Sequence, residues 1–91
     1  MYYVIPPDIS ITIKDGKKAI FKNIKKGKEW TFTKKPVVQI ANILNLNDRI
    51  SLSSSKISEK TNIGETDVIG HIKVLIKKGL VSNKDDVFLY E

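Results

Sequence analysis

The stretch from residue 53 to residue 81 restricts the folds open to this chain more than any other part of the sequence. Apolar side chains recur in it at i, i+4, i+7 and i+8: Val68, Ile72, Leu75 and Ile76. This spacing predicts a helix over about residues 65–78 with one buried face. Gly79 follows two lysines, an order typical of a helix end, because basic side chains suit the negative end and glycine accepts a left-handed backbone. We expect the rest of the chain to pack on this helix.

Two further helices are expected upstream of it. A serine in the run 53–55 can cap a helix of about seven residues that buries Ile57, and residues 61–64 turn the chain between the two helices. Earlier still, apolar residues at i, i+3, i+4 and i+7 predict another helix with a buried face: Val37, Ile40, Ala41 and Leu44. Thr33 is its expected cap, and Pro36 fits its first turn.

The first 32 residues favour β-structure. Residues 2–5 predict a short strand that two prolines end, because proline cannot donate to a strand ladder. Residues 9–13 alternate strictly, which puts three isoleucines on one face. Residues 29–32 predict either a third strand or an aromatic lid over the helices.

The turn at Asp15-Gly16 allows two hairpin registers. A two-residue loop would set Ile11 opposite Ile20. A three-residue loop with Gly16 left-handed brings four apolar side chains to one face: Ile9 opposite Phe21 and Ile11 opposite Ala19. We prefer the second register, because it keeps the apolar residues of both strands together.

The sequence after residue 48 predicts three more short strands. Residues 49–52 suit a small strand between the first and second helices. Residues 80–81 and 87–90 are expected to pair as a hairpin with residues 82–86 at its tip.

The order of these elements resembles the winged helix-turn-helix superfamily. The residues that carry the resemblance are Ser54, Ile57, Ser58, Ile63, Val68, Ile72, Leu75, Gly79, Leu80 and Val81. The resemblance implies an α+β fold, a three-helix winged helix-turn-helix over residues 33–91, with residues 1–32 as an N-terminal β-hairpin extension packed on that core. Residues 74–81 also resemble the winged-helix N-terminal domain of the T-even phage middle-promoter activators, a domain associated with contacting host transcription machinery. This similarity implies a phage or mobile-element protein.

Composition argues against several classes of protein. The chain has no cysteine, which excludes disulfides and thiolate metal sites, and its single histidine, His71, leaves no histidine cluster for zinc. No nucleophile or second base is placed beside His71, so we expect neither an enzyme nor a cofactor. The longest apolar run is far shorter than the ~18–20 residues of a membrane span, and no signal peptide is visible, so a cytoplasmic protein is expected.

The basic charge lies in the first 36 residues, which carry nine lysines against three acids, whereas residues 37–91 carry seven bases and seven acids. The net charge of +6 favours a polyanion partner, most simply double-stranded DNA. In this interpretation the protein is a small DNA-binding transcriptional regulator. Its predicted DNA contacts come from the helix over 65–78 and from lysines elsewhere: Thr66, Gly70, Lys73, Lys77, Lys14, Lys17, Lys18, Lys22, Lys25, Lys26, Lys28 and Lys84.

A second interpretation makes the same helix a protein-docking surface with little direct DNA binding. Apolar residues wrap most of its circumference, more than one buried face requires, so Ile69 and Val74 are the predicted contacts with a partner. That partner would be a second copy, forming a homodimer, or a protein of the transcription or replication machinery. Glu65 and Asp67 depart from the superfamily's basic helix start, and carboxylates near phosphates cost DNA affinity. Both interpretations stay open at the level of sequence.

Overall fold

The structure, a computed structural model, describes residues 1–47 and 50–90. Within them the chain forms two antiparallel three-stranded sheets and three helices. In chain order the elements are β1 (Tyr2–Val4), β2 (Ile9–Lys14), β3 (Lys18–Asn23), β4 (Lys28–Phe32), α1 (Lys35–Leu46), β5 (Leu52–Ser53), α2 (Ser54–Thr61), α3 (Glu65–Lys77) and β6 (Ser82–Lys84). Arg49, the first residue of one predicted strand, lies outside the described residues. The α+β class is confirmed.

The first sheet has the order β2-β3-β4, so residues 28–32 form a third strand and not a lid. The β2–β3 loop has three residues, and Gly16 is left-handed with φ +64°, as preferred from the sequence. The predicted pairs are wrong by two residues, because a three-residue loop sets Lys14 opposite Lys18 and therefore Ile11 opposite Phe21. The shared face is confirmed, since a shift of two residues keeps every side chain on its side of the sheet.

Helix α1 packs on this sheet against β2 and β3. The buried side chains on its inner face are those that the spacing predicts: Val37, Ile40, Ala41 and Leu44. Its predicted cap is wrong, because the first helical hydrogen bond runs from the Val38 N–H to the Lys34 carbonyl over 3.0 Å. Lys34 is therefore the N-cap, without a side-chain hydrogen bond, and Thr33 lies outside the helix.

Helices α2 and α3 follow the sequence pattern closely. The Ser53 hydroxyl caps α2 by accepting from the Lys56 N–H at 3.1 Å, and Ile57 is fully buried. The Ser58 hydroxyl donates to the Ile63 carbonyl and ties the turn to α2. After α3, Gly79 adopts φ +75°, the left-handed conformation expected of a glycine that ends a helix.

The second sheet has the order β5-β1-β6, with the N-terminal strand in its centre. The predicted wing hairpin is wrong: residues 80–81 form no strand, β6 pairs with β1, and Leu89 bridges to Ile50. Tyr3 and Val4 of β1 are 5% and 1% exposed. By pairing with β1, β6 therefore joins a strand that is part of the buried structure, which the predicted pairing with residues 87–90 would not provide. The division of the chain after residue 32 stays a prediction.

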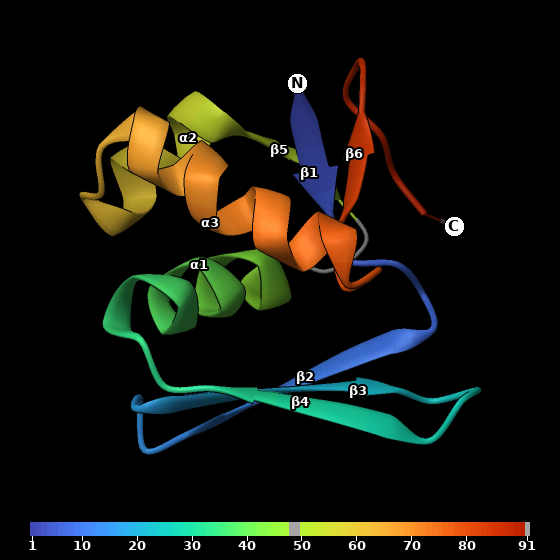
Figure 1. Ribbon diagram of the computed structural model, residues 1–91. Helices are drawn as coiled ribbons and strands as arrows, with labels where there is room; N and C mark the ends of the chain where they lie inside the picture. The colour runs from blue at the N-terminus through green and yellow to red at the C-terminus, as the bar shows by residue number, and fades with distance from the viewer. Residues whose placement is uncertain (48–49, 91) are drawn as a thin grey trace.

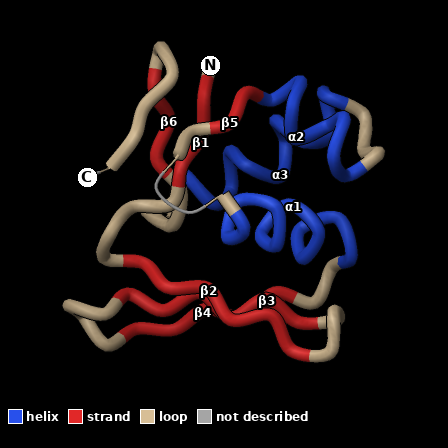
Figure 2. Tube along the Cα trace, turned by 180° about the vertical axis from the view of Figure 1, so that it is seen from behind, coloured by secondary structure: helices blue, strands red, loops and turns tan. Residues whose placement is uncertain are grey.

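Helix α1 lies between the two sheets, and α2 lies beside the β5-β1-β6 sheet. Figures 1 and 2 place α1 next to the β2-β3-β4 sheet and put the β5-β1-β6 sheet on the far side of α1. The core reaches from the first sheet through α1 into α3, and these fully buried side chains come from β3 and the three helices: Phe21, Ile40, Leu44, Ile57, Ile72 and Leu75. No helix of the described residues is long and apolar enough to cross a membrane.

Candidate functional site

Strand β4 forms one edge of the first sheet. In the part of the chain that the structure describes, β4 pairs with β3 and no strand pairs with its other side. The N–H and C=O groups along that outer side are a template for pairing with an added chain. An edge strand of five residues is long enough for such pairing to matter.

The inner face of β4 is covered less completely than those of its neighbours. Helix α1 packs over β2 and β3, which leaves Ala19 and Phe21 of β3 fully buried. Trp30 and Phe32 of β4 lie opposite Phe21 and Ala19 in the pairing, but they are only partly buried. The Phe32 ring meets the Phe21 ring edge to face, with 5.4 Å between centroids, and so continues the core outward.

Between β4 and α3 this incomplete covering leaves a groove of about 340 Å³, named here the β4–α3 groove. Its lining residues come from β4 and the chain after it, from α1 and from α3: Thr31, Phe32, Thr33, Lys34, Val37, His71, Val74 and Leu75. Its apolar residues suit a bulky aliphatic or aromatic side chain, while the threonines, Lys34 and His71 supply polar contacts. An unpaired strand edge therefore runs beside an apolar groove.

Val74 is the most exposed apolar residue of the groove. It is 50% exposed, although Leu75 beside it in the sequence is 1% exposed. Burial of a valine side chain from water is worth about 1.5–3 kcal/mol, so a partner that covers Val74 recovers part of that free energy. The predicted partner contacts, Val74 and Ile69, lie on different faces of α3. They are five residues apart, and at about 100° per residue this is one full turn plus roughly 140°. Ile69 is partly buried and does not line the groove.

A second hollow, of about 500 Å³, lies next to the β4–α3 groove. It is named here the lysine hollow, and its lining residues are Gly16, Lys17, Lys18, Thr33 and Lys35. Thr33 lines both cavities, so the lysine hollow lies next to the groove at the end of β4. The hollow offers three ammonium groups at one end of an apolar groove.

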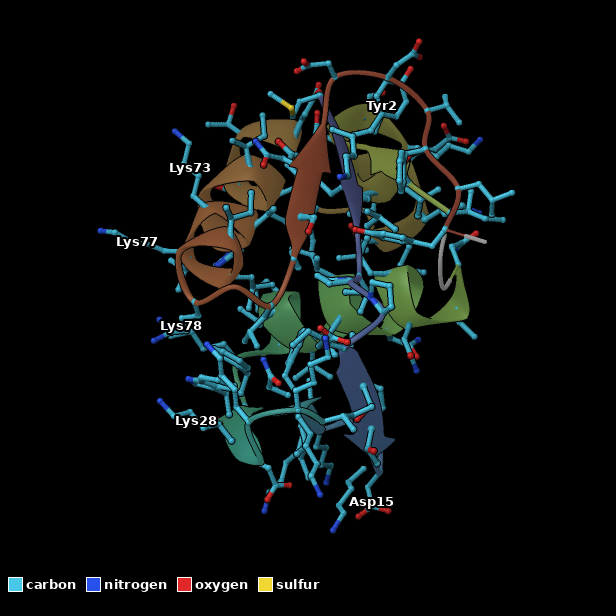
Figure 3. All side chains as sticks on the ribbon, turned by 90° about the vertical axis from the view of Figure 1, so that its right-hand side faces the viewer. Tyr2, Asp15, Lys28, Lys73, Lys77 and Lys78 are labelled. Carbon is cyan, nitrogen blue, oxygen red and sulfur yellow. The ribbon has the colours of Figure 1, made fainter. Side chains whose placement is uncertain are left out.

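More lysines gather around the opposite end of the groove, where β4 begins and α3 ends. Lys28, Lys73, Lys77 and Lys78 lie on the same side of the molecule in Figure 3, and all four are exposed. Among the other lysines predicted as DNA contacts, Lys25 pairs with Asp8 at 3.5 Å, and the Lys84 ammonium lies 4.5 Å from the centroid of the Phe88 ring. Lys14, Lys22 and Lys26 are exposed.

The α3 residues that were predicted to contact DNA lie on the surface. Thr66, Gly70, Lys73 and Lys77 are exposed, on the side of α3 away from the buried Val68 and Ile72. Glu65 has a structural contact, since it accepts a hydrogen bond of 2.7 Å from the Ser54 hydroxyl. Burial raises the pKa of Tyr3, and the charge of Glu65 raises it further. Glu65 thus helps to join α3 to α2.

His71, the single histidine, lines the β4–α3 groove and is partly buried. Among residues 1–47 and 50–90, no three His, Cys, Asp or Glu side chains come together as a metal site.

From the sequence we singled out Val74 as a contact residue but missed Thr31, Phe32, Thr33 and Lys34, which line the groove only because β4 and α3 come together in the fold. One sequence feature could have pointed to them: Trp30 and Phe32 alternate with polar residues, as in the last strand of an antiparallel sheet with one exposed edge.

Comparisons with known proteins identify the fold. No family model and no curated protein matches the chain. It is similar to the solved structure of TbiB1 in complex with the TbiA(β) leader peptide, with a TM-score of 0.68 at 13% identity over 91% of this chain and 99% of that one. It is also similar to lasso peptide synthetase B1 complexed with the leader peptide, with a TM-score of 0.63 at 16% identity over 89% and 98%. At these identities the similarity concerns the fold.

These matches overturn the resemblance on which the DNA interpretation depended. The winged helix-turn-helix assignment is wrong, because the chain matches, over almost their whole length, proteins solved with leader peptides. The prediction of a DNA-binding transcriptional regulator, with double-stranded DNA as its partner, is wrong with it. The helix pair that suggested it is present, but the wing that would complete such a domain is replaced by the pairing of β6 with β1. The alternative, a protein-interaction module, fits these findings better.

Proposed function

We propose that this protein binds a peptide, the leader segment of a precursor peptide, in the β4–α3 groove. The observation that carries the proposal is the unpaired outer side of β4 beside an apolar groove. A peptide that pairs with such an edge gains main-chain hydrogen bonds, and its alternate side chains enter the neighbouring pocket. Two structures of the same fold were solved with leader peptides, which supports this choice of ligand.

The proposed role is binding without catalysis. His71 lies where it would contact the peptide, with Val74 and Leu75 on the same wall of the groove. We assign it no acid or base function. Strand β4 has five residues, so the paired segment of the peptide would be about as long, with bulky apolar residues at positions i and i+2 facing α3.

A displayed library of random 12-residue peptides tests the proposal. The library is selected on the intact protein, and each recovered peptide is then tested for binding to the Val74→Asp variant. We expect peptides with apolar residues two positions apart that change the emission of Trp30, the single tryptophan, which lies in β4. Failure to recover any peptide, or recovery only of peptides that bind the Val74→Asp variant equally well, would contradict the proposal.

Amide hydrogen exchange then locates a selected peptide. Pairing with the outer side of β4 protects alternate N–H groups over residues 28–34, because in an antiparallel ladder every second residue points its N–H to the same neighbour. Uniform protection, or protection confined to β6, would place the peptide elsewhere.

A further inference from the structure

Lysines lie at both ends of the β4–α3 groove, although an apolar groove can bind an apolar side chain without them. At the start of β4 and the end of α3 lie Lys28, Lys77 and Lys78, with Lys73 one turn earlier on α3 (Figure 3). All four are exposed, so their ammonium groups are open to a partner in solvent. Ammonium groups on flexible stems at a groove entrance attract an anionic partner and raise its rate of association.

The other end of the groove has the same sign. Lys34 lines the groove itself, and the neighbouring lysine hollow, which shares Thr33 with the groove, adds Lys17, Lys18 and Lys35. None of the residues that line either cavity is Asp or Glu. Glu29, the one acid of β4, is exposed on the opposite face from Trp30 and lies across from Lys22 in the pairing. An apolar centre is thus bounded at both ends by positive charge.

We propose that the peptide bound in the groove is acidic on both sides of an apolar centre. This inference rests on the proposed function. An extended chain advances about 3.3 Å per residue, and β4 has five residues, so the two acidic flanks would stand about five to seven residues apart. One flank meets the lysine hollow and the other meets Lys28, Lys77 and Lys78. The flanks select the ligand, while the apolar residues and the main chain hold it.

A peptide fits this arrangement better than a nucleic acid does. The aromatic rings of β4 are partly buried against the core and offer no stack of exposed faces, which single strands require. A nucleic acid also lacks the regular alternation of N–H and C=O groups that forms a ladder with an open strand edge, whereas a peptide backbone has it in every residue.

Three peptide libraries test the inference. Each has five random central positions, and the flanks on both sides are fixed as acidic, as glutamine or as lysine. We expect acidic flanks to bind about tenfold or more tightly than glutamine flanks at low salt, with the difference shrinking as salt screens exposed charges. Equal affinity for acidic and glutamine flanks would overturn the acidic-peptide inference and leave the groove proposal standing. If no library gives a peptide that depends on Val74, the proposed function itself fails.

Paired lysine variants assign each flank to one end. We expect Lys17→Gln with Lys18→Gln, or Lys77→Gln with Lys78→Gln, to weaken an acid-flanked peptide about threefold to tenfold and to leave a glutamine-flanked one unchanged. The matched control is Lys56→Gln with Lys60→Gln on α2, exposed lysines that line neither cavity. A peptide acidic at one end only should respond to one pair only, which also gives its direction along β4. If the peptide acidic at one end responds equally to both pairs, or if a single-stranded oligonucleotide displaces the peptide equally well, the lysines form a general polyanion surface and the inference is overturned.

Discussion

At the scale of single residues, Val74 distinguishes a folding role from a binding role most sharply. Helix α3 needs Val68, Ile72 and Leu75 for the core, and these are buried. Val74 lies beside them in the groove and stays half exposed. Its side chain adds little to the stability of the free protein and much to the apolar surface offered to a ligand.

Val74→Asp should therefore abolish peptide binding, with an affinity at least tenfold lower, because the groove would have to bury an unpaired carboxylate. The free energy of unfolding should change by no more than about 0.5 kcal/mol, as for other exposed sites. Val87→Asp is the matched control, since Val87 is 65% exposed and lines neither cavity. Fluorescence anisotropy of a selected peptide and urea denaturation measure the two effects. Equal losses of binding in both variants would contradict the assignment of Val74.

Tyr3 predicts how stability depends on pH. Burial, and then the charge of Glu65, raises the pKa of Tyr3 above its usual value near 10. As the pH rises past about 10, unfolded molecules lose the tyrosyl proton while folded molecules keep it, so the free energy of unfolding falls until the folded pKa is reached. Below that range the tyrosine adds no pH dependence.

Tyr3→Phe should flatten this alkaline loss of stability. Every other ionisable group is common to the two proteins, so the difference between the two stability curves isolates Tyr3. Tyr2→Phe on the same strand is the control for the loss of one hydroxyl. Urea denaturation at several values from pH 8 to pH 11 gives the free energy of unfolding against pH. Parallel curves for wild type and Tyr3→Phe would contradict the prediction.

At the scale of elements, Gly70 inside α3 and Gly79 after its end have opposite effects on stability, although their surroundings are similar. A Cβ added at Gly70 or at Gly79 meets nothing within 4 Å, so packing does not distinguish them. The backbone does, because Gly79 has φ +75° and Gly70 lies inside the helix. Gly70→Ala should stabilise the protein by up to about 1 kcal/mol, from helix propensity. Gly79→Ala should destabilise it by about 1 kcal/mol, from the left-handed conformation.

Urea denaturation of both variants measures this difference, with the m-value expected to stay constant. A neutral Gly79→Ala would mean that the chain leaves α3 by another route. The prediction matters for the site, because the end of α3 sets the position of Lys77 and Lys78.

The elements also show how far sequence patterns reach. Helical spacing gave the buried faces of α1 and α3, and serine chemistry gave the cap of α2, because each depends on residues close in sequence. The partner of β6 was missed for the opposite reason. Its pairing with β1 joins residues about eighty positions apart, and no local pattern distinguishes that partner from the nearby residues 87–90.

At the scale of the whole molecule, β1 connects the two ends of the chain. It lies between β5 and β6, and its residues Tyr3 and Val4 are buried, as is Ile5 after it. Burial of each is worth about 1.5–3 kcal/mol, and together this approaches the total stability of a small domain. Removal of residues 1–5 should therefore unfold the protein.

Circular dichroism and thermal denaturation check this expectation. Removal of Met1 alone, which is 56% exposed, is the control and should leave a cooperative transition. A cooperative transition in the protein without residues 1–5 would mean that the rest of the fold does not depend on β1.

The sequence by itself determined the helices, their buried faces, the hairpin loop and the positive sign of the charge around the candidate site, because these follow from local spacing, turn chemistry and composition. Tertiary structure alone decided that β1 enters the second sheet, that β4 keeps one open edge and that Val74 faces β4 across a groove. The physical reason is the same in each case. Strand pairing and grooves depend on which distant surfaces meet, and the free energy of that meeting comes from burial that no stretch of the sequence can achieve by itself.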